Sequence, residues 1–412
     1  MALRNWAGNY TYLAREVHTP STFEQLHEIV TRSAQIQVLG SRHSFTDIGD
    51  SAELVSLDAL ASEVVVDREQ MTVTCGAAVR YGELATALER EGLALANLAS
   101  LPHIGVAGAV CTATHGSGER NGNLASGVRS VELLTSDGRL LSIAKGQADF
   151  EGAVVGLGAL GVMTRVTLAV EPFYEVRQRV YEPLAWETLV EGFDEIMASG
   201  YSVSVFTRWG EQAGQVWVKA RAEDRSLEDE LVGVPAANAE RHPIEGFDPV
   251  HATPQLGVPG PWFDRLPHFR MGFTPSSGAE IQSEYIVARE HAREAIAAVR
   301  SVSGMVGPLT QVSEIRTVAA DSLWMSPQYA QDTAAIHFTW KPRQDAVERA
   351  VAELERVLEP LAPRPHWGKL FLAGARTIAS RYERLPDFRE LREHLDPRGA
   401  FRNPWLERHV LG

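Results

Sequence analysis

The first 173 residues alternate short apolar runs with amphipathic stretches, a pattern that predicts a compact α+β domain. Apolar positions three and four residues apart predict a helix over "PSTFEQLHEIVTRSA". Ser21 and Glu24 are spaced as a capping box at its start, and Phe23, Leu26 and Val30 share its apolar face. This helix leads into the buried run "IQVLG", which predicts a strand that ends in a tight turn.

Strand and turn signals fill the rest of this region. The segments "SEVVVDREQMTVTCGA" and "SVELLTSDGRLLSIA" each predict two strands joined by a polar turn. Between them, "YGELATALEREGLAL" predicts a helix that ends at Gly92. The strand-like "GVMTRVTLAVEP" closes the domain at about residue 173.

The pattern changes after residue 173 to aromatic-rich alternation. The segments "YSVSVFTRW", "GQVWVKARA" and "AEIQSEYIV", with two more near Glu314 and His337, predict the strands of a large antiparallel sheet. Helices are predicted from about Glu290 to Val302 and over "QDAVERAVAELERVLEPL". The stretch 235–278 is rich in Pro, Gly and His and lacks periodicity, so we expect it to cross the surface.

Composition narrows the classes of partner. The formal net charge of -14 argues against an electrostatic grip on nucleic acid or an anionic membrane. Cys75 and Cys111 are the two cysteines, and their apolar surroundings predict buried thiols in a reducing compartment rather than a disulfide or zinc site. No apolar run is long enough for a membrane span or a signal peptide. We therefore expect a soluble, cytoplasmic monomer without a metal site, acting on a small neutral molecule.

Two glycine-rich stretches are candidates for holding an anionic cofactor. "GSRHSF" follows the strand that ends at Gly40, and "SLPHIGVAGAVCTATHGSGERNGNLAS" combines glycines with Thr112, Thr114 and His115. Such a loop lets backbone N–H groups approach a pyrophosphate. It lacks the GxGxxG spacing of a dinucleotide fold and the GKS or GKT of a nucleoside-triphosphate site. Taken alone, it is equally well explained as structural turns.

A set of paired polar residues forms the second candidate site. Glu314 and Arg316 are two residues apart in "SEIRT", as are His337 and Thr339 in "HFTW". On strands, each pair therefore faces one side of the sheet. This arrangement predicts either a polar wall of a binding site or a solvated sheet face with an ordinary ion pair.

Long, ordered motif agreement separates these alternatives. The stretches "NWAGNYTY", "GSRHSF", "LPHIGVAG", "ATHGSG", "FTPSSGAE", "SEIRTVAAD", "HFTW" and "RPHWGK" resemble those of the bacterial alditol oxidases, a group within the vanillyl-alcohol-oxidase-type flavoproteins that is related to the aldonolactone oxidases. The resemblance covers nearly the full chain. It implies a two-domain α+β fold, with an FAD-binding domain over 1–173 and a substrate-binding domain over 174–375, the latter a large antiparallel sheet flanked by helices. Residues 376–412 would pack back on the FAD domain.

The resemblance implies that FAD is attached covalently to His43 through its 8α-methyl carbon. Arg42 stands where these oxidases often have glycine, which changes side-chain crowding there. No cysteine precedes the glycine-rich loop, where Ala99 and Ser100 lie, so one covalent bond is expected rather than two. The other residues that would bind the cofactor are Gly40, Ser41, Arg42, Ser44, Ser100, Gly108, Thr112, Thr114, His115, Gly116, Gly118 and Val162.

The implied reaction is oxidation of the terminal primary alcohol of an alditol such as xylitol or sorbitol to the aldose, with O2 reduced to H2O2. The matching substrate residues are Ser100, Glu314, Arg316, Thr339 and Lys369. Catalytic roles fall to Lys369, Arg316, His337 and Glu314, and His337 and a neutral Lys369 are both candidates for the proton acceptor. Two alternatives stay open: an aldonolactone oxidase or dehydrogenase of the same fold, and a non-catalytic carbohydrate-binding protein.

Overall fold

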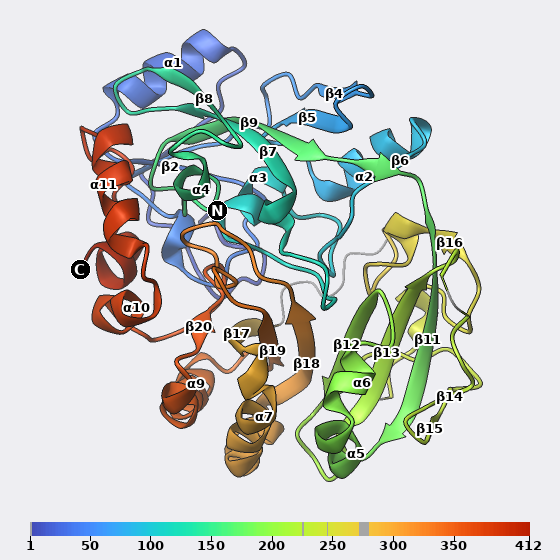
Figure 1. The fold of residues 1–412 in the computed structure, drawn as a ribbon. Helices are drawn as coiled ribbons and strands as arrows, with labels where there is room; N and C mark the ends of the chain where they lie inside the picture. Colours follow the sequence, from blue (N-terminus) through green and yellow to red (C-terminus); the bar gives the residue numbers. More distant parts are fainter. Residues whose placement is uncertain (1, 225, 245, 272–279) are drawn as a thin grey trace.

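A computed structural model describes residues 2–224, 226–244, 246–271 and 280–412, and its ribbon is drawn in Figure 1. Most of the quoted motif "FTPSSGAE" lies outside the described residues. The chain forms two regions, each built around its own sheet, with the N-terminal sheet above the larger sheet in the view of Figure 1.

The N-terminal region contains a five-stranded sheet in the order β4-β5-β9-β7-β8, with its bounds at Val64–Asp67, Thr72–Gly76, Val162–Ala169, Val128–Leu134 and Leu140–Ala144. All its neighbours pair antiparallel, as the two predicted strand-turn-strand segments require. Helices α2 (Tyr81–Arg90), α3 (Val106–Cys111) and α4 (Phe150–Ala153) belong to this region. Gly92 follows α2 with a φ of +65°, so the predicted helix end is confirmed.

A smaller parallel sheet precedes it, in the order β1-β3-β2 with bounds Glu16–His18, Glu53–Val55 and Ile36–Val38. Helix α1 (Phe23–Arg32) connects β1 to β2 and buries Leu26. The predicted cap is wrong by one residue, because the side chain of Thr22 accepts from the N–H of Gln25. Phe23 stays 36% exposed, because it is the first residue of the helix.

The larger sheet has eight strands in the order β16-β11-β13-β12-β18-β19-β17-β20. Their bounds are Gly260–Pro261, Glu175–Leu184, Gly214–Arg221, Ser202–Thr207, Thr310–Val318, Thr333–Trp340, Ile281–Ala288 and Arg364–Pro365. Every pair in this sheet is antiparallel, as predicted. Two short hydrogen-bonded pairs lie beside the sheets: β6 (Leu93–Ala94) with β10 (Glu171–Pro172), and β14 (Glu230–Leu231) with β15 (Val234–Pro235).

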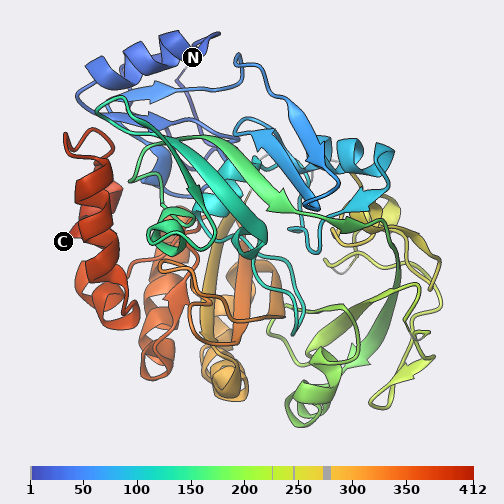
Figure 2. The same cartoon turned by 45° about the horizontal axis from the view of Figure 1, so that its top comes forward.

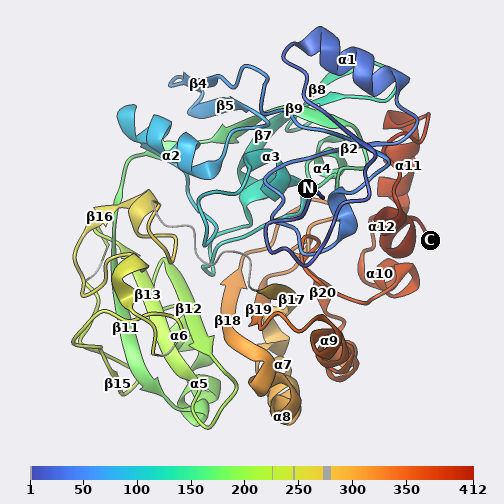
Figure 3. The ribbon, with the colours of Figure 1, turned by 180° about the vertical axis from the view of Figure 1, so that it is seen from behind.

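Helices cover the face of the large sheet that points away from the N-terminal region (Figures 1 and 3). They are α5 (Trp186–Glu191), α6 (Phe193–Met197), α7 (Ala292–Ser301), α8 (Ser303–Val306) and α9 (Gln344–Leu358). Apolar side chains of α7 and α9 are buried in the core, as their periodicity predicts. The opposite face of the sheet is therefore the one that meets the N-terminal region.

Part of the aperiodic stretch 235–278 is buried, so the prediction of a surface crossing is wrong there. Thr253, Gln255, Trp262 and His268 are each exposed by 6% or less. Side-chain hydrogen bonds compensate for the missing periodic structure, for example those from Gln178 on β11 to Thr253.

The C-terminal segment returns to the N-terminal region, along the flank that Figure 2 shows in red. It contains α10 (Ala375–Arg381), α11 (Leu385–Leu395) and α12 (Pro404–Leu406). The N–H of Ile36 donates to the carbonyl of Ala400 at 2.8 Å, and Asn403 donates to the carbonyls of Ile48 and Asp50. The last residues thus complete the packing around β2.

Candidate active site

A cavity of about 520 Å³ lies between the two regions and contains both glycine-rich stretches and the paired polar residues. Its walls come from the turn after β2, the loop around α3, the inner face of the large sheet and the loop before residue 370. These segments are far apart in the sequence. The fold alone brings them to one cavity.

The His43 side chain lines the cavity and makes no side-chain hydrogen bond to the described residues. Both ring nitrogens are buried without a hydrogen-bond partner among the described residues, and the ring stacks on Trp6 at 4.4 Å. Burial, with a smaller contribution from His103, lowers the pKa of His43 to about 4. The imidazole is therefore neutral at pH 7 and has a free lone pair, which fits a covalent partner in the cavity.

Arg42 has a φ of +59°, in the left-handed region that disfavours residues with a Cβ. Its side chain is exposed and reaches only the carbonyl of Arg4, at 3.4 Å. A residue with a Cβ at this position therefore carries backbone strain. The side-chain crowding that the sequence suggested is not found.

The glycine-rich loop has two kinds of glycine. A Cβ on Gly40, Gly105 or Gly108 would meet nothing within 4 Å, and all three line the cavity, so a ligand can approach their backbone closely. By contrast, a Cβ on Gly116 would lie 2.3 Å from Asn97 Oδ1, and one on Gly118 would lie 2.4 Å from the carbonyl of Tyr201. These two glycines are required by packing inside the protein.

Most of the cofactor residues predicted from the sequence line the cavity, and three do not. The lining ones are Gly40, Ser41, Arg42, His43, Ser44, Ser100, Gly108, Thr112, Thr114 and His115. Gly116 and Gly118 lie behind the lining, and Val162 packs in the hydrophobic cluster beside α1, while its neighbours Gly161 and Met163 face the cavity. Ser41 Oγ accepts from the N–H of Gly105 at 3.3 Å, which ties the two glycine-rich stretches together.

The paired polar residues form one wall, because β18 and β19 are neighbours in the sheet and Glu314 is paired with His337. Arg316 forms an ion pair with Glu314 at 2.9 Å, and His337 Nε2 lies 3.0 Å from Thr339 Oγ1. All four residues are buried and line the cavity, so the solvated sheet face is excluded. Burial is the largest single influence and opposes ionisation of Glu314, but Arg316, His268 and His337 together outweigh it and hold the pKa of Glu314 well below its usual range.

Lys369 joins this wall from the loop after β20. Its Nζ lies 2.5 Å from Glu284 Oε2 and 2.9 Å from His337 Nδ1. Burial lowers the pKa of Lys369, and the negative charge of Glu284 partly offsets that shift. The pKa of His337 is held well below its usual range by burial and by Lys369, so its ring is neutral at pH 7.

The turn that carries His43 and the loop that carries Lys369 are directly joined by hydrogen bonds. The N–H of Phe45 donates to the carbonyl of Gly368 at 2.9 Å, and the N–H of Gly368 donates to Nδ1 of His366 at 3.1 Å. His366 lines the cavity, whereas Trp367 is fully buried in the core. These bonds fix Lys369 relative to His43.

Sequence reasoning missed two charged or polar partners of the wall. Glu284 on β17 contacts Lys369 and also lies 3.4 Å from His115 Nε2. The sequence does contain a pattern that points to Glu284: Gln282 and Glu284 are two residues apart on a strand, the same spacing as in the other polar pairs of the wall. His268, whose Nε2 lies 2.8 Å from Glu314 Oε1, belongs to an aperiodic segment that carries no such signal.

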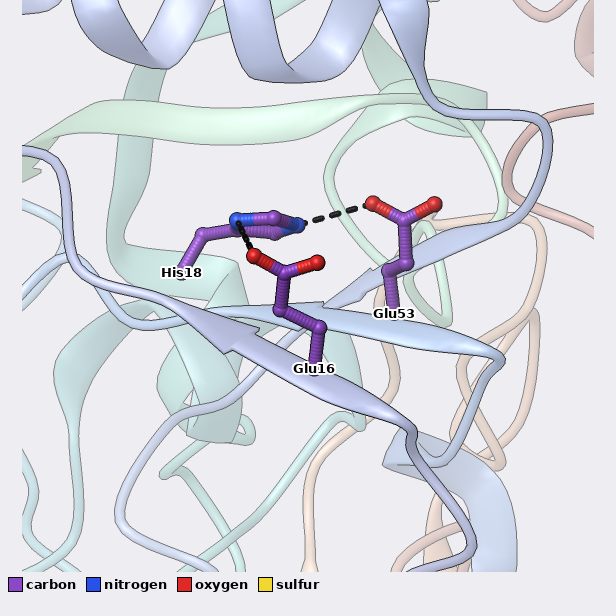
Figure 4. A group of neighbouring side chains, drawn as sticks. All are labelled: Glu16, His18 and Glu53. Carbon is purple, nitrogen blue, oxygen red and sulfur yellow. Dashed lines mark hydrogen bonds and ion pairs between the residues drawn. The ribbon is translucent and has the colours of Figure 1, made fainter.

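One cluster outside the cavity has metal-ligand chemistry. Glu16, His18 and Glu53 come together on β1 and β3, as Figure 4 shows. His18 Nε2 lies 2.8 Å from Glu53 and Nδ1 lies 3.4 Å from Glu16, so both ring nitrogens already face carboxylates. Ser33 also donates to Glu53 at 2.9 Å. These interactions account for the cluster without an ion.

Residues 15–144 match a family model described as an FAD binding domain, and residues 278–409 match one described as D-arabinono-1,4-lactone oxidase. Over nearly its whole length the chain is 50% identical to an alditol oxidase of Streptomyces sp., and the match covers 98% of each chain. The chain belongs to the alditol oxidase family. Among the described helices, none combines the length and apolar character that crossing a membrane requires.

More distant relatives extend the comparison. An L-gulono-1,4-lactone dehydrogenase of Mycobacterium tuberculosis is 28% identical, over 99% of this chain and 98% of the relative. The crystal structure of cholesterol oxidase from B. sterolicum superposes with a TM-score of 0.79 at 15% identity, covering 99% of this chain and 96% of that one. This alditol oxidase family member thus has the vanillyl-alcohol-oxidase-type fold and an FAD-binding domain, as the motifs implied.

Proposed function

We propose that this chain oxidises the terminal primary alcohol of alditols such as xylitol and sorbitol to the aldose, using FAD, with O2 reduced to H2O2. The observation that carries the proposal is one cavity in which two buried ion pairs, Glu314–Arg316 and Glu284–Lys369, face the turn that presents His43. A non-catalytic carbohydrate-binding protein would have no use for the unpartnered, buried imidazole.

We propose that His43 holds FAD through a single covalent bond to the flavin 8α carbon. When bound, FAD supplies the hydride acceptor and passes the electrons to O2. Residues of this chain that would hold it are His43, the backbone at Gly40, Gly105 and Gly108, and the hydroxyls of Ser41 and Thr114. The open space at these glycines and the neutral, unpaired imidazole support the fit.

The polar wall would bind the polyol by its alternating donors and acceptors. Glu314 accepts from substrate hydroxyls, Arg316 donates to them, and the hydroxyls of Ser100 and Thr339 do both. Ser100 Oγ lies 3.5 Å from Arg316, so the serine belongs to the same wall. These contacts orient the terminal carbon in a water-poor cavity.

Negative charge develops on the substrate oxygen as its proton leaves and while the terminal carbon still holds its hydride, and Arg316 and Lys369 would stabilise that charge. The proton passes to the His337–Lys369 pair in its free-base form, in which Lys369 is a neutral amine whose Nζ lone pair accepts the proton, or to His337 as the alternative acceptor. Because a 2.9 Å hydrogen bond joins these two candidates, a proton accepted by one is shared with the other. Glu284 keeps the pair close to neutral overall.

The decisive experiment compares H2O2 production from xylitol and sorbitol with that from L-gulono-1,4-lactone and D-arabinono-1,4-lactone. We expect the alditols to be faster. A lactone oxidase or dehydrogenase is the second candidate, favoured by the family match over residues 278–409 and by the mycobacterial relative. Lactone turnover well above xylitol turnover, with O2 or with an artificial electron acceptor, would replace the first proposal by the second.

Acid precipitation tests the covalent bond. Flavin should stay with wild-type polypeptide and be released entirely from His43→Ala. His103→Ala is the matched control, because His103 is the neighbouring histidine that contributes to the pKa of His43 but does not line the cavity. Release of flavin from wild-type protein would refute the covalent bond, and we would then conclude that FAD is bound non-covalently.

We propose the division into an FAD domain over 1–173, a substrate domain over 174–375 and a C-terminal segment over 376–412. The five-stranded sheet within 64–169 and the eight-stranded sheet within 175–365 support it. The monomeric state and cytoplasmic location stay predictions, and light scattering after gel filtration tests the first.

A further inference from the structure

Lys219 on β13 has a buried amino group that the proposed mechanism does not use. Burial lowers the pKa of Lys219 to about 7, and the negative charge of Glu314 opposes that shift, so the ammonium form is populated at neutral pH. The Lys219 side chain is 1% exposed, and its Nζ lies 2.5 Å from the carbonyl of Leu266, 3.1 Å from that of Pro267 and 3.3 Å from His268 Nδ1. An ammonium has three N–H donors and no acceptor. The two carbonyls and the imidazole nitrogen therefore take up all three.

With Lys219 in its ammonium form, this arrangement fixes the tautomer of His268. Because Nδ1 accepts from the ammonium, the neutral ring carries its proton on Nε2. Nε2 lies 2.8 Å from Glu314 Oε1, where an N–H is needed to face the carboxylate. The other oxygen of Glu314, Oε2, pairs with Arg316 at 2.9 Å. Lys219 thus acts on Glu314 through His268.

The wall has a second lysine–histidine pair, in which the lysine again faces Nδ1 of the histidine and Nε2 faces another polar side chain. Lys369 donates to Nδ1 of His337, and Nε2 of His337 faces Thr339 Oγ1 at 3.0 Å. That pair belongs to the proposed catalytic cluster. The Lys219–His268 pair has the same chemistry and ends on the carboxylate that would bind the polyol.

We propose that Lys219 and His268 are positioning residues for substrate recognition, which hold Glu314 with one lone pair of each oxygen free to accept polyol hydroxyls. This inference rests on the proposed function, since it assigns Glu314 to the substrate. Each carboxylate oxygen can accept two hydrogen bonds. Oε1 of Glu314 accepts one, from His268, and Oε2 faces Arg316 in an ion pair at 2.9 Å, so each oxygen keeps a lone pair for the substrate. Without the Nε2–H of His268, Glu314 would turn toward Arg316 and lose that geometry.

The first test compares two substitutions of His268 in the flavin-loaded full chain. His268→Gln retains an N–H donor that can reach Glu314 and has no tautomer to fix, whereas His268→Leu has no donor. We expect His268→Leu to raise KM for xylitol by about 10-fold or more, because a hydrogen bond to a charged group is lost. His268→Gln should stay within about threefold of wild type. Equal KM values for the two variants would overturn the proposal.

The second test asks whether Lys219 acts through the tautomer or only as a clamp on Leu266 and Pro267. Lys219→Met should raise KM by about 10-fold while the limiting rate of flavin reduction changes by less than about threefold. Adding His268→Gln should bring KM back toward wild type, since glutamine needs no tautomer lock. If Lys219 only holds the carbonyls of Leu266 and Pro267, the double variant will keep the raised KM. That result would refute the proposal. Lys341→Met, which removes another lysine bonded to a backbone carbonyl, is the control.

A spectroscopic measurement separates failure of this inference from failure of the proposed function. Selective ¹⁵N-histidine labelling reports the tautomer of His268, with the resonance assigned by its absence in His268→Gln. The Nε2–H form is expected in wild type and a changed form in Lys219→Met. An Nδ1–H form in wild type refutes the inference whichever substrate is oxidised. If wild type instead prefers a lactone, the proposed function fails and the KM comparison is made with that lactone.

Discussion

At the scale of single residues, Lys369 has the most direct link to rate. Its amino group lies between Glu284 and His337 in the cavity, and the positive charge it carries once it has taken up a proton interacts more strongly with a developing alkoxide than with a neutral alcohol. Lys369→Met should therefore slow flavin reduction by xylitol about 10²- to 10³-fold, a loss of roughly 3 to 4 kcal/mol in transition-state stabilisation. Anaerobic stopped-flow reduction at saturating xylitol measures this step.

Methionine keeps much of the length and packing of the lysine stem, so the substitution isolates charge and hydrogen bonding. A fall of less than about threefold in the limiting rate, or a rise in the apparent Kd alone, would make Lys369 a binding residue. Arg316 and His337 would then carry the catalytic role.

Arg42 offers a test of backbone strain at the cofactor turn. Its φ of +59° costs a residue with a Cβ about 1 kcal/mol or more, which glycine does not pay. Arg42→Gly should therefore be more stable than Arg42→Ala by about 1 kcal/mol in thermal or denaturant unfolding. Alanine is the matched control, because it removes the same side chain and keeps the strain. Equal stability of the two variants would show that the turn relaxes.

At the scale of elements, β17 matters because it brings Glu284 beside β19 and the Lys369 loop. The negative charge of Glu284 favours the protonated form of Lys369, so Glu284→Gln should lower the pKa of that lysine. Turnover needs a free base in the His337–Lys369 pair and falls as pH falls through the pKa of the pair. The acid limb of the kcat profile should therefore shift to lower pH.

A pH profile of kcat for wild type and Glu284→Gln checks this shift. Glu290→Gln, which removes an exposed carboxylate just beyond the end of β17, should leave the profile unchanged. A shift to higher pH, or none, would mean that Glu284 does not face the proton acceptor during the reaction.

The strand pairs explain how much of the site the sequence could predict. Two-residue spacing put Glu314 with Arg316 and His337 with Thr339 on common faces, and their burial confirms that these faces line a cavity. Gln282 and Glu284 have the same spacing on β17, and they also line the cavity. His268 could not be found, because the loop that carries it has no period and its position depends on contacts with Lys219.

At the scale of the whole molecule, the C-terminal segment closes the N-terminal region. Asn403 is 2% exposed, caps α12 through Leu406, and donates to the carbonyls of Ile48 and Asp50 at 2.9 and 3.0 Å. Asn403→Ala leaves two carbonyls and a helix start without these partners. We expect the free energy of unfolding to fall by about 2 to 4 kcal/mol.

Denaturant unfolding of the flavin-loaded protein measures the loss. Arg402→Ala is the matched control, because it removes a neighbouring side chain whose ion pair with Glu407 is half exposed, and it should cost less than about 1 kcal/mol. Equal losses for the two variants would mean that the segment is not held by Asn403.

The sequence by itself determined the local structure and the chemistry of each motif. Periods of 3.6 and 2 residues specify helices and strand faces because they depend only on neighbours along the chain. They were sufficient for α2, β7, β9 and the antiparallel sheet, and motif agreement singled out His43. The exact cap of α1 was missed because Ser21 and Thr22 are both good cap residues and only the backbone path selects one.

The tertiary structure alone decided which of these motifs share a cavity. Lys369 meets Glu284 across 85 residues, and Arg316 meets Ser100 across 216. Those meetings depend on the strand order β12-β18-β19-β17 and on packing between the two sheets. No local pattern encodes a long-range pairing of charges, because the energy that favours it exists only after both partners are buried together.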